Sequence, residues 1–560
     1  MLSEDQVSSH DLNHLGLVAA VIDKIGLVKK IDERLPLEKN RGAKVSMGQR
    51  VAAMILNGLG FVENRLYIFP EFLENKPVKR LFGPEIEASD FNDDVLGRCL
   101  DEIYKYGVTK LFAEIAFSIG TTFGLLGKTA RFDTTSLTVY GDYEDDEAES
   151  TTTSNQEPDP EEKDPFKITY GYSKDGRPDL KQVVLNLATT GKANLPIWME
   201  PHSGNASDKV ILERAAERMK KFASALKEAP SFLFVGDSAM YEKCVEDAGD
   251  MLWLSRVPHV LKKAQEVLVL EDEKLSWINL EKGYRVSHAL EVKYKEVTQR
   301  WVIVSSEQMY KREVATLDKK IDKEQEEATK ELWHLSNQIF ACEKDAKKAI
   351  KLLGPKLKYH AVSWMIEPVS QHEGKGRPKK GSTPNVVGYQ VKANLNRDEE
   401  KISLLHRAKG RFILATNQLD KTQLSEEDML KEYKQQTHTE AGFRFIKGNA
   451  FEVAGVFLKK ETRVQALMMV MTLCLMIYNL AQYFLREALL KNQDTVPNQL
   501  KKPTNKPTMA WICHLFCRIH IVYIRFEPQT QELVSNLTEL LRRIIHYFGH
   551  VAEKIYGLSE

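Results

Sequence analysis

The chain has 560 residues, more than a single hydrophobic core usually serves, so two or more domains are expected. Its apolar content of 42% and charged content of 28% are those of an ordinary soluble globular protein. The 79 basic and 79 acidic side chains cancel, which excludes a uniformly basic nucleic-acid-binding chain. The acidic charge is segregated, however, because Asp142–Asp164 holds eleven Asp or Glu residues and one Lys. Without this tract the chain is net positive by about ten, enough for a basic face.

The sequence predicts a cytoplasmic protein with no membrane partner. Six cysteines are few for this length and indicate reduced thiols. The start, Met-Leu-Ser-Glu-Asp-Gln, has neither a basic nor an apolar stretch, so no signal peptide is expected. Only Val464–Leu485 approaches membrane length, and its polar residues favour a helix buried on nearly all sides.

Residues 1–128 are predicted to form a helical N-terminal domain. Amphipathic spacing is present over Leu15–Leu35, Val45–Leu56 and Val95–Leu126. Aromatic and basic residues mix around Arg65–Phe69, a composition that suits binding of DNA ends. Simple helix packing would explain the same residues, so both interpretations stand.

Residues 129–262 change to short strands and are predicted to be the first part of a catalytic core. We expect a strand at Arg131–Val139, a hairpin of Phe166–Tyr172 with Gln182–Thr189 around a turn at 173–179, and a strand at Leu195–Glu200. Helices at Asp208–Leu226 and Ser238–Ala248 should then alternate with strands at Ser231–Val235 and Met251–Arg256. This order is typical of an RNase H-like domain. The tract Asp142–Asp164 is expected to be a solvated loop within it.

Residues 263–400 break that order and are predicted to be an insertion domain of mixed structure. Two strands are expected in Val286–Val304, and a helical hairpin in Lys311–Leu353. Strands at Tyr359–Glu367 and Val386–Ala393 should flank a cationic loop. The fold class predicted is therefore α/β, an RNase H-like core interrupted by a mixed insertion, with helical N-terminal and C-terminal regions.

Residues 401–490 are predicted to complete the core, and residues 491–560 to form a helical C-terminal region. A strand at Arg411–Thr416 comes first. Ser425-Glu-Glu-Asp is a cap-and-first-turn signature for the helix that should carry Glu440.

Three acidic residues stand out by their positions in these elements. Asp133 and Asp237 each end a strand-like run, and Glu440 belongs to a helix. Hard cations such as Mg²⁺ prefer oxygen ligands, and two ions about 3.5–4 Å apart can promote in-line attack on a phosphodiester. Asp is common after strands, so neither aspartate is informative alone. The order strand-Asp, strand-Asp, helix-Glu predicts a two-metal site.

The helix around Glu440 should present polar and cationic groups beside the carboxylate. On a continuous helix, residues three, four and seven apart share one face. That face would hold five side chains, Tyr433, Gln436, Glu440, Arg444 and Lys447.

The sequence resembles the DDE transposases of bacterial insertion sequences, in the branch with a Tyr-(2)-Arg-(3)-Glu-(6)-Lys motif. The motif is present as Tyr433-(2)-Gln436-(3)-Glu440-(6)-Lys447, with Gln in place of Arg. The resemblance covers roughly residues 129–490. It also includes Phe132-Asp-Thr-Thr-Ser, Gly171-Tyr-Ser-Lys-Asp-Gly-Arg-Pro-Asp-Leu-Lys-Gln182, Gly236-Asp-Ser and Ala415-Thr-Asn.

The resemblance implies that Asp133, Asp237 and Glu440 bind two Mg²⁺ or Mn²⁺ ions, and that Tyr433 and Lys447 contact phosphates of the transposon end. Gln436 can hydrogen-bond a phosphate but brings no charge, and Arg444 could supply the missing cation. The insertion of the resembled family often contacts DNA. The predicted DNA contacts are Tyr433, Gln436, Arg444, Lys447, Lys174, Arg177, Lys181, Lys375, Arg377, Lys379 and Lys380.

The function implied is that of an insertion-sequence transposase. It would bind terminal inverted repeats, hydrolyse DNA phosphodiesters and transfer the 3′ ends to target DNA. The implied partners are double-stranded DNA and a second copy of the chain, in a bacterial cytoplasm and at the nucleoid when bound to DNA. Two alternatives remain open, a catalytically silent DNA-binding descendant and a two-metal nuclease without strand transfer.

Overall fold

The computed structural model describes residues 7–37, 44–60, 69–139, 143, 166–226, 231–246, 249–372, 383–447, 460–526 and 529–559. The chain divides into two compact units, one made of Met1–Leu254 with Glu432–Glu560 and the other of Ser255–Lys431. The acidic tract at 142–164, apart from Tyr143, lies outside the described residues. So do four predicted DNA contacts, Lys375, Arg377, Lys379 and Lys380.

The N-terminal part of the first unit is helical, as predicted. Its elements are β1 (Val7–Asp11), α1 (Leu15–Lys24), α2 (Leu27–Arg34), α3 (Met47–Leu59), α4 (Phe69–Glu74), α5 (Val78–Phe82), η4 (Ala88–Phe91), α6 (Asp93–Tyr106) and α7 (Val108–Thr122). The start of α3 is fixed by a capping box, in which the Ser46 hydroxyl accepts from Gln49 N and the Gln49 side chain accepts from Ser46 N.

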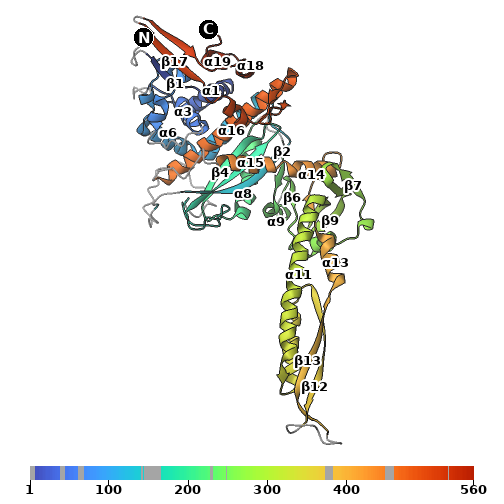
Figure 1. Ribbon diagram of the computed structural model, residues 1–560. Coiled ribbons are helices and arrows are strands. Elements are labelled where there is room, and N and C mark those ends of the chain that lie inside the picture. The colour runs from blue at the N-terminus through green and yellow to red at the C-terminus, as the bar shows by residue number, and fades with distance from the viewer. Residues whose placement is uncertain are drawn as a thin grey trace. The chain divides into compact units, whose positions relative to one another are not determined.

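The core of this unit is organised around α16 (Glu461–Lys491), which packs against α1, α3, α6 and β4 (Leu195–Ser203) (Figure 1). By length and composition α16 could span a membrane, but 78% of its most apolar window is buried inside the protein. This agrees with the buried helix predicted for Val464–Leu485, since apolar residues on all sides of a helix suit a site enclosed by other elements.

The sheet of the first unit has the strand order β4-β3-β2-β5-β6, so that the fold is mixed α/β. Its other strands are β2 (Thr129–Thr138), β3 (Gln182–Thr190), β5 (Leu233–Gly236) and β6 (Leu252–Arg256). The β2–β3 and β3–β4 pairs are antiparallel, whereas β2–β5 is parallel. Helix α8 (Asp208–Ser224) follows β4, and α9 (Ser238–Glu246) follows β5, in the predicted order.

The predicted hairpin of Phe166–Tyr172 with Gln182–Thr189 is wrong. The second segment is β3, but the first forms only one bridge, between Thr169 and Gln182. Because β2 and β4 already occupy the two edges of β3, no edge is left along its length for another strand.

The second unit has its own strands, ordered β14-β10-β8-β7, with β9 also paired to β10. Its strands are β7 (Trp277–Leu280), β8 (Tyr284–Ser287), β9 (Leu290–Tyr294), β10 (Val297–Ser306), β11 (Ile339–Phe340), β12 (His360–Gln371), β13 (Asn385–Arg397) and β14 (Arg411–Thr416). Its helices are α10 (Lys262–Leu268), η5 (Asp272–Lys274), η6 (Glu281–Gly283), α11 (Glu307–Asn337), α12 (Glu343–Lys351), η7 (Gly354–Lys356) and α13 (Glu399–Ala408).

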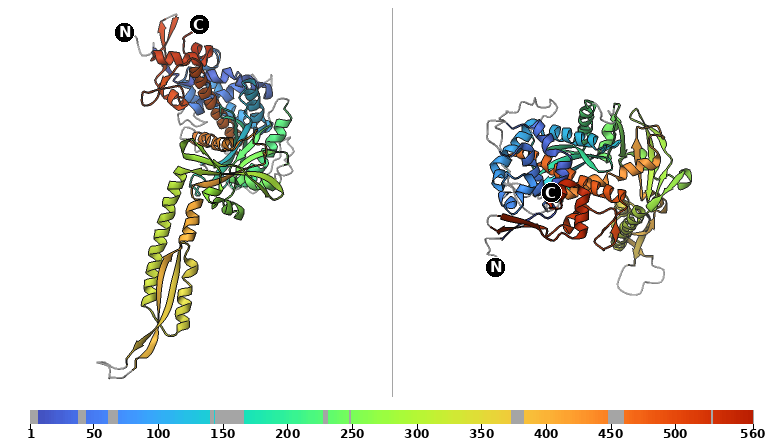
Figure 2. Two further views of the ribbon diagram at one scale, coloured as in Figure 1. Left: turned by 90° about the vertical axis from the view of Figure 1, so that its right-hand side faces the viewer. Right: turned by 90° about the horizontal axis from the view of Figure 1, so that it is seen from above.

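The second unit differs from the prediction in two places. The segment 286–304 contains parts of three strands rather than two, because β9 and β10 turn at Lys295 and Glu296, both with positive φ. The helical stretch is one helix of 31 residues, α11, followed by the shorter α12. The hairpin of β12 and β13 lies along α11 (Figures 1 and 2).

The C-terminal residues are not all helical, contrary to the prediction for 491–560. They form β15 (Val496–Pro497), β16 (Pro503–Thr504), α17 (Met509–Leu515), β17 (His520–Phe526), β18 (Gln529–Val534), α18 (Glu539–Phe548) and α19 (His550–Ile555). Strand β17 pairs with both β18 and β1. Its sequence, His-Ile-Val-Tyr-Ile-Arg-Phe, is rich in the β-branched and aromatic residues that favour strands.

Candidate active site

Strand register brings two of the predicted carboxylates level with one another on neighbouring strands of the first unit's sheet. In the parallel pair of β2 and β5, Arg131 lies opposite Val235. Asp133 and Asp237 are each two residues further along, so they follow the same paired position. Asp237 directly follows β5, whereas β2 continues to Thr138, so the prediction that Asp133 ends its strand is wrong and Asp133 lies in the middle of β2.

The positive charge around Asp133 is too small to offset its burial and its acidic neighbours. Its pKa is raised to about 7, chiefly by burial and to a smaller extent by the nearby carboxylates of Asp237 and Glu440. A hydrogen bond from the backbone N–H of Thr134, 2.8 Å long, and the charge of Lys174 act in the opposite direction. The three predicted carboxylates are therefore electrostatic neighbours.

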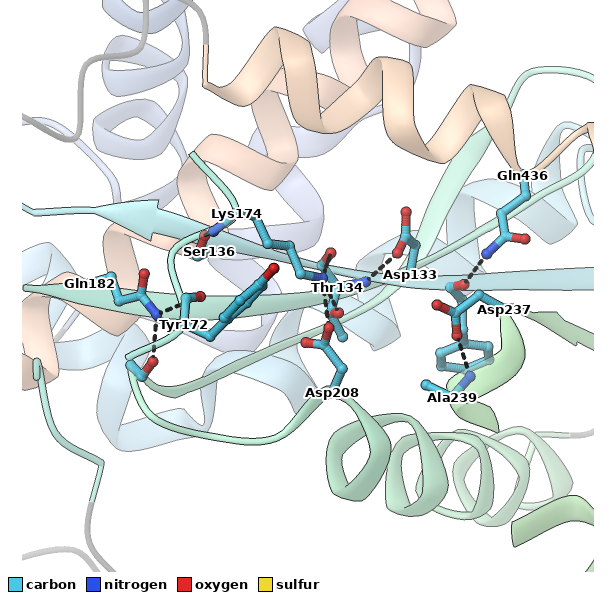
Figure 3. A network of polar contacts seen from close by, with 12 residues as sticks. Asp133, Thr134, Ser136, Tyr172, Lys174, Gln182, Asp208, Asp237, Ala239 and Gln436 are labelled. Atoms are coloured by element: carbon cyan, nitrogen blue, oxygen red, sulfur yellow. Dashed lines mark hydrogen bonds and ion pairs between the residues drawn. The ribbon is translucent and has the colours of Figure 1, made fainter. Parts of the chain in front are cut away.

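Asp237 stands at the junction between β5 and α9. Its Oδ1 accepts a hydrogen bond of 2.9 Å from the backbone N–H of Ala239, in the first turn of α9 (Figure 3). Its side chain is exposed. A carboxylate at a helix N-terminus is favoured there by the helix dipole, which suits Asp237 to its position between β5 and α9.

The predicted single helix around Glu440 is broken into two. Helix α14 (Glu426–Lys434) begins after Ser425, whose hydroxyl accepts from Asp428 N at 3.1 Å, as the cap signature predicts. The chain then turns at Gln435 and Gln436, and α15 (Thr437–Ile446) carries Glu440 in its first turn. Tyr433 precedes this turn and Lys447 follows the last turn of α15, so the prediction of five side chains on one continuous helical face is wrong.

The break in the helix has a cause in the contacts of Gln436. This side chain is only 7% exposed, and its amide donates to the carbonyl oxygen of Phe132 over 3.2 Å, next to Asp133 (Figure 3). One turn later, the buried hydroxyl of Thr439 lies 2.8 Å from that of Thr189 on β3. These two contacts hold the first turn of α15 against the sheet, with Glu440 on its exposed side.

Arg131 adds a second attachment for this segment. It is buried on β2, two residues before Asp133, and its guanidinium donates to Glu432 at 2.6 Å and also to Gln435. The hydroxyl of Thr129 donates to the same Glu432 carboxylate at 2.8 Å. Strand β2 therefore binds the chain before the turn, at Glu432, and within it, at Gln435 and Gln436.

The far side of α15 packs against α16. A Cβ at Gly442 would lie 3.0 Å from the Leu475 side chain, so the two helices approach closely there. The rings of Phe445 and Tyr478 are 4.3 Å apart between centroids. The position of Glu440 is thus set by β2, β3 and α16 together.

Several predicted DNA contacts are engaged inside the protein. Lys174 donates to the carbonyl and hydroxyl of Thr134, both at 2.8 Å, and pairs with Asp208 at 2.8 Å (Figure 3). Lys447 pairs with Asp175 at 2.7 Å. Arg177 pairs with Asp179 at 2.8 Å, and Lys181 donates to the carbonyl oxygen of Tyr143. Tyr433 is half-buried and Arg444 is exposed.

Gln436 does not suit the predicted phosphate contact, because its buried amide is directed at β2. Sequence reasoning also missed residues that build the site, namely Arg131, Asp208, Asp175 and Thr439. Arg131 could have been suspected, since an Arg within a strand of otherwise buried residues requires a partner. The others had no comparable signal, because their partners lie far away in the chain.

The oxygen ligands suit a divalent cation in chemistry, since Asp133, Asp237 and Glu440 are all carboxylates. Over the residues that the structure describes, no three His, Cys, Asp or Glu side chains are close enough together to form a metal-binding group. The three carboxylates are thus neighbours that act on the pKa of Asp133 without forming a closed set of ligands.

Comparisons with known proteins give limited further information. A domain of unknown function, DUF4277, matches residues 7–117, which run from β1 into α7 and exclude the candidate site. No curated protein matches the chain. A cryo-EM structure of a piggyBac transposase synaptic complex with hairpin DNA is similar at 9% identity, covering 90% of this chain and 79% of that chain with a TM-score of 0.35. This likeness is slight and assigns no residue of the site.

Proposed function

We propose that the protein is a transposase of the DDE type, which cleaves DNA at the ends of a mobile element and joins the 3′ ends to target DNA. One observation carries the proposal. The carboxylates of Asp133 within β2, of Asp237 just after the parallel strand β5, and of Glu440 on α15, which packs on β2 and β3, are electrostatic neighbours at Asp133. The strand order β4-β3-β2-β5-β6 gives further support, since an RNase H-like core is expected to begin with such a meander.

The proposed cofactors are two Mg²⁺ or Mn²⁺ ions, held by Asp133, Asp237 and Glu440. Bound there, they would polarise a phosphoryl oxygen and lower the pKa of an attacking water or hydroxyl. A cation would also favour the ionised form of Asp133, whose pKa of about 7 leaves it partly protonated at neutral pH.

The chain's own residues have distinct tasks in this proposal. Gln436 and Thr439 hold the first turn of α15 on the sheet, which keeps the charge of Glu440 near Asp133. Arg444 lies one turn beyond Glu440 and is exposed, which leaves it able to contact a phosphate in place of the family arginine that Gln436 replaces. Lys447 would contact phosphate after leaving Asp175.

The test is strand cleavage by the Glu440→Gln variant on double-stranded DNA that carries the element's ends. Loss of one metal ligand should reduce cleavage by at least about a thousandfold, because metal catalysis contributes several kcal/mol. DNA binding measured by gel shift should change little, since Glu440 is exposed and holds no buried contact that the fold needs. Undiminished cleavage would remove the carboxylates from the mechanism.

Product analysis separates the proposal from its alternatives. A nuclease releases 3′ ends that stay unjoined, whereas a transposase joins them to a supercoiled target plasmid. A silent DNA-binding descendant would bind the ends without metal-dependent nicking. The same reactions, run after cross-linking, test the further proposal that two copies of the chain assemble on a pair of DNA ends.

A further inference from the structure

An exposed aromatic ring stands next to the candidate site without a place in the metal chemistry. Tyr172 is 87% exposed, which is high for a large aromatic side chain. Two residues later, the ammonium group of Lys174 contacts the carbonyl oxygen of Thr134, the neighbour of Asp133. Figure 3 shows the Tyr172 ring on the side of Asp133 where Lys174 and Thr134 lie.

The backbone that presents this ring is fixed, although the segment is not a strand. The carbonyl oxygen of Tyr172 accepts from the amide of Gln182 at 3.2 Å, and the same amide donates to Gly204 at 2.7 Å. Gln182 is itself only 1% exposed. A Cβ at Gly171 would lie 1.9 Å from the carbonyl oxygen of Gly204, so only glycine allows this approach.

A rigid backbone with an exposed ring suits a ligand that has a flat apolar face. Ordering costs little when the side chain has two rotatable bonds and its backbone is already held. At a site built for phosphodiesters, the flat group joined to the phosphate through the sugar is a nucleotide base. In a duplex both faces of each base are covered by its neighbours, so the base must be unpaired and unstacked.

We propose that the ring of Tyr172 is a stacking platform for an unpaired nucleotide base adjacent to the phosphodiester bound at Asp133, an inference that rests on the proposed function. Lys174 is not the principal anchor of this nucleotide, because its ammonium is held by Thr134 and Asp208. Stacking on Tyr172 should therefore contribute affinity that depends weakly on salt, unlike contacts between cations and phosphates.

The test uses a forked DNA duplex with 2-aminopurine as the first unpaired base, and full-length protein carrying Glu440→Gln in every variant to prevent cleavage. Stacking on tyrosine should quench the fluorescence of the bound base. Tyr172→Ala should abolish the quench and weaken binding to the fork on the order of tenfold, with the salt slope unchanged. Tyr172→Phe should retain both the quench and the affinity.

Tyr170→Ala is the matched control. Tyr170 is 55% exposed and lies under the Lys181 ammonium at 5.9 Å, so its loss removes a neighbouring aromatic ring without touching Tyr172. It should leave the quench intact. A Tyr172→Ala variant that binds the fork and quenches like its parent overturns the stacking platform alone. A parent protein that binds neither the fork nor a matched duplex overturns the proposed DNA partner as well.

Discussion

The carboxylates of the candidate site and the cations of the adjacent turn at 173–179 are compensated very differently. Lys174 of this turn is paired with Asp208, and Asp175 of the same turn pairs with Lys447. Asp133, a short distance away on β2, keeps a pKa of about 7, because burial and two acidic neighbours outweigh the effect of Lys174. The protein alone thus pairs Lys174 and Lys447 with aspartates and leaves Asp133 with a raised pKa.

This difference predicts the order of binding events. A divalent cation would relieve the repulsion that Asp237 and Glu440 exert on Asp133. A phosphate must instead compete with an aspartate for each paired cation. The site should therefore accept metal before DNA, and the four predictions below test the two sides of this comparison.

The largest effect is expected from Asp133→Asn on stability. A carboxyl group with pKa about 7 in the folded protein and about 4 when unfolded binds its proton more tightly in the folded state. It therefore stabilises the fold fully below about pH 4, and this contribution is lost as the pH rises through about 7. Asn cannot ionise, so the variant should be more stable than the parent at pH 8 by up to ~4 kcal/mol.

The effect of Asp133→Asn on stability is measured by thermal unfolding at pH 5 and pH 8, with and without Mg²⁺. The parent should lose stability between the two values without metal and regain much of it at pH 8 with Mg²⁺, whereas the variant should respond weakly to both. Asp179→Asn, on an exposed side chain paired with Arg177, is the control and should behave like the parent. Equal pH responses of parent and Asp133→Asn would mean that the pKa of Asp133 is not raised in the folded protein.

The next effect concerns the buried cation of β2. Arg131→Met keeps most of the side-chain volume but leaves the Glu432 carboxylate, 23% exposed, without its guanidinium partner. Loss of one member of a buried pair should cost roughly 3 kcal/mol in the free energy of unfolding of the first unit, measured by urea titration. Arg177→Met removes an exposed pair and should cost less than about 1 kcal/mol. Similar costs for the two variants would contradict the role given to burial.

A smaller effect is expected at Gln436. Gln436→Met retains an unbranched side chain but loses the amide that donates to the Phe132 carbonyl, at a cost of about 1–2 kcal/mol. Because this bond holds the start of α15, the variant should also need a higher Mg²⁺ concentration for half-maximal cleavage. A variant with lower stability but an unchanged Mg²⁺ requirement would show that Gln436 supports the fold without positioning Glu440.

The strands of the site could be predicted from local sequence, and their environment could not. Strand β3, predicted over Gln182–Thr189, spans Gln182–Thr190 in the structure, because a run rich in β-branched and apolar residues that follows a turn specifies a strand. The interruption of the helix at Gln436 could not be predicted, because the sequence around it is compatible with a continuous helix. The buried bond to Phe132, which is 304 positions away, decides it.

The pairing of the cations was unpredictable for the same reason. Lys447 and Asp175 are 272 positions apart, and nothing in either local sequence indicates the other. Charges clustered in a sequence suggest phosphate binding, but the fold determines which of them are already compensated. Local patterns therefore identified the acidic residues, whereas the electrostatic balance of the site required the tertiary structure.

The smallest effect is expected from Asp175→Asn. This change frees Lys447 from an ion pair in which the two side chains are 21% and 37% exposed, so the pair itself contributes at most about 1 kcal/mol. Lys447 would then meet phosphate without competition, and affinity for duplex DNA should rise about two- to fivefold at low salt, with a steeper dependence on salt concentration. Asp179→Asn removes an equally acidic residue of the same turn but does not touch Lys447. A gain in affinity that is the same in both variants would reflect net charge alone, whereas a gain confined to Asp175→Asn assigns it to the pair with Lys447.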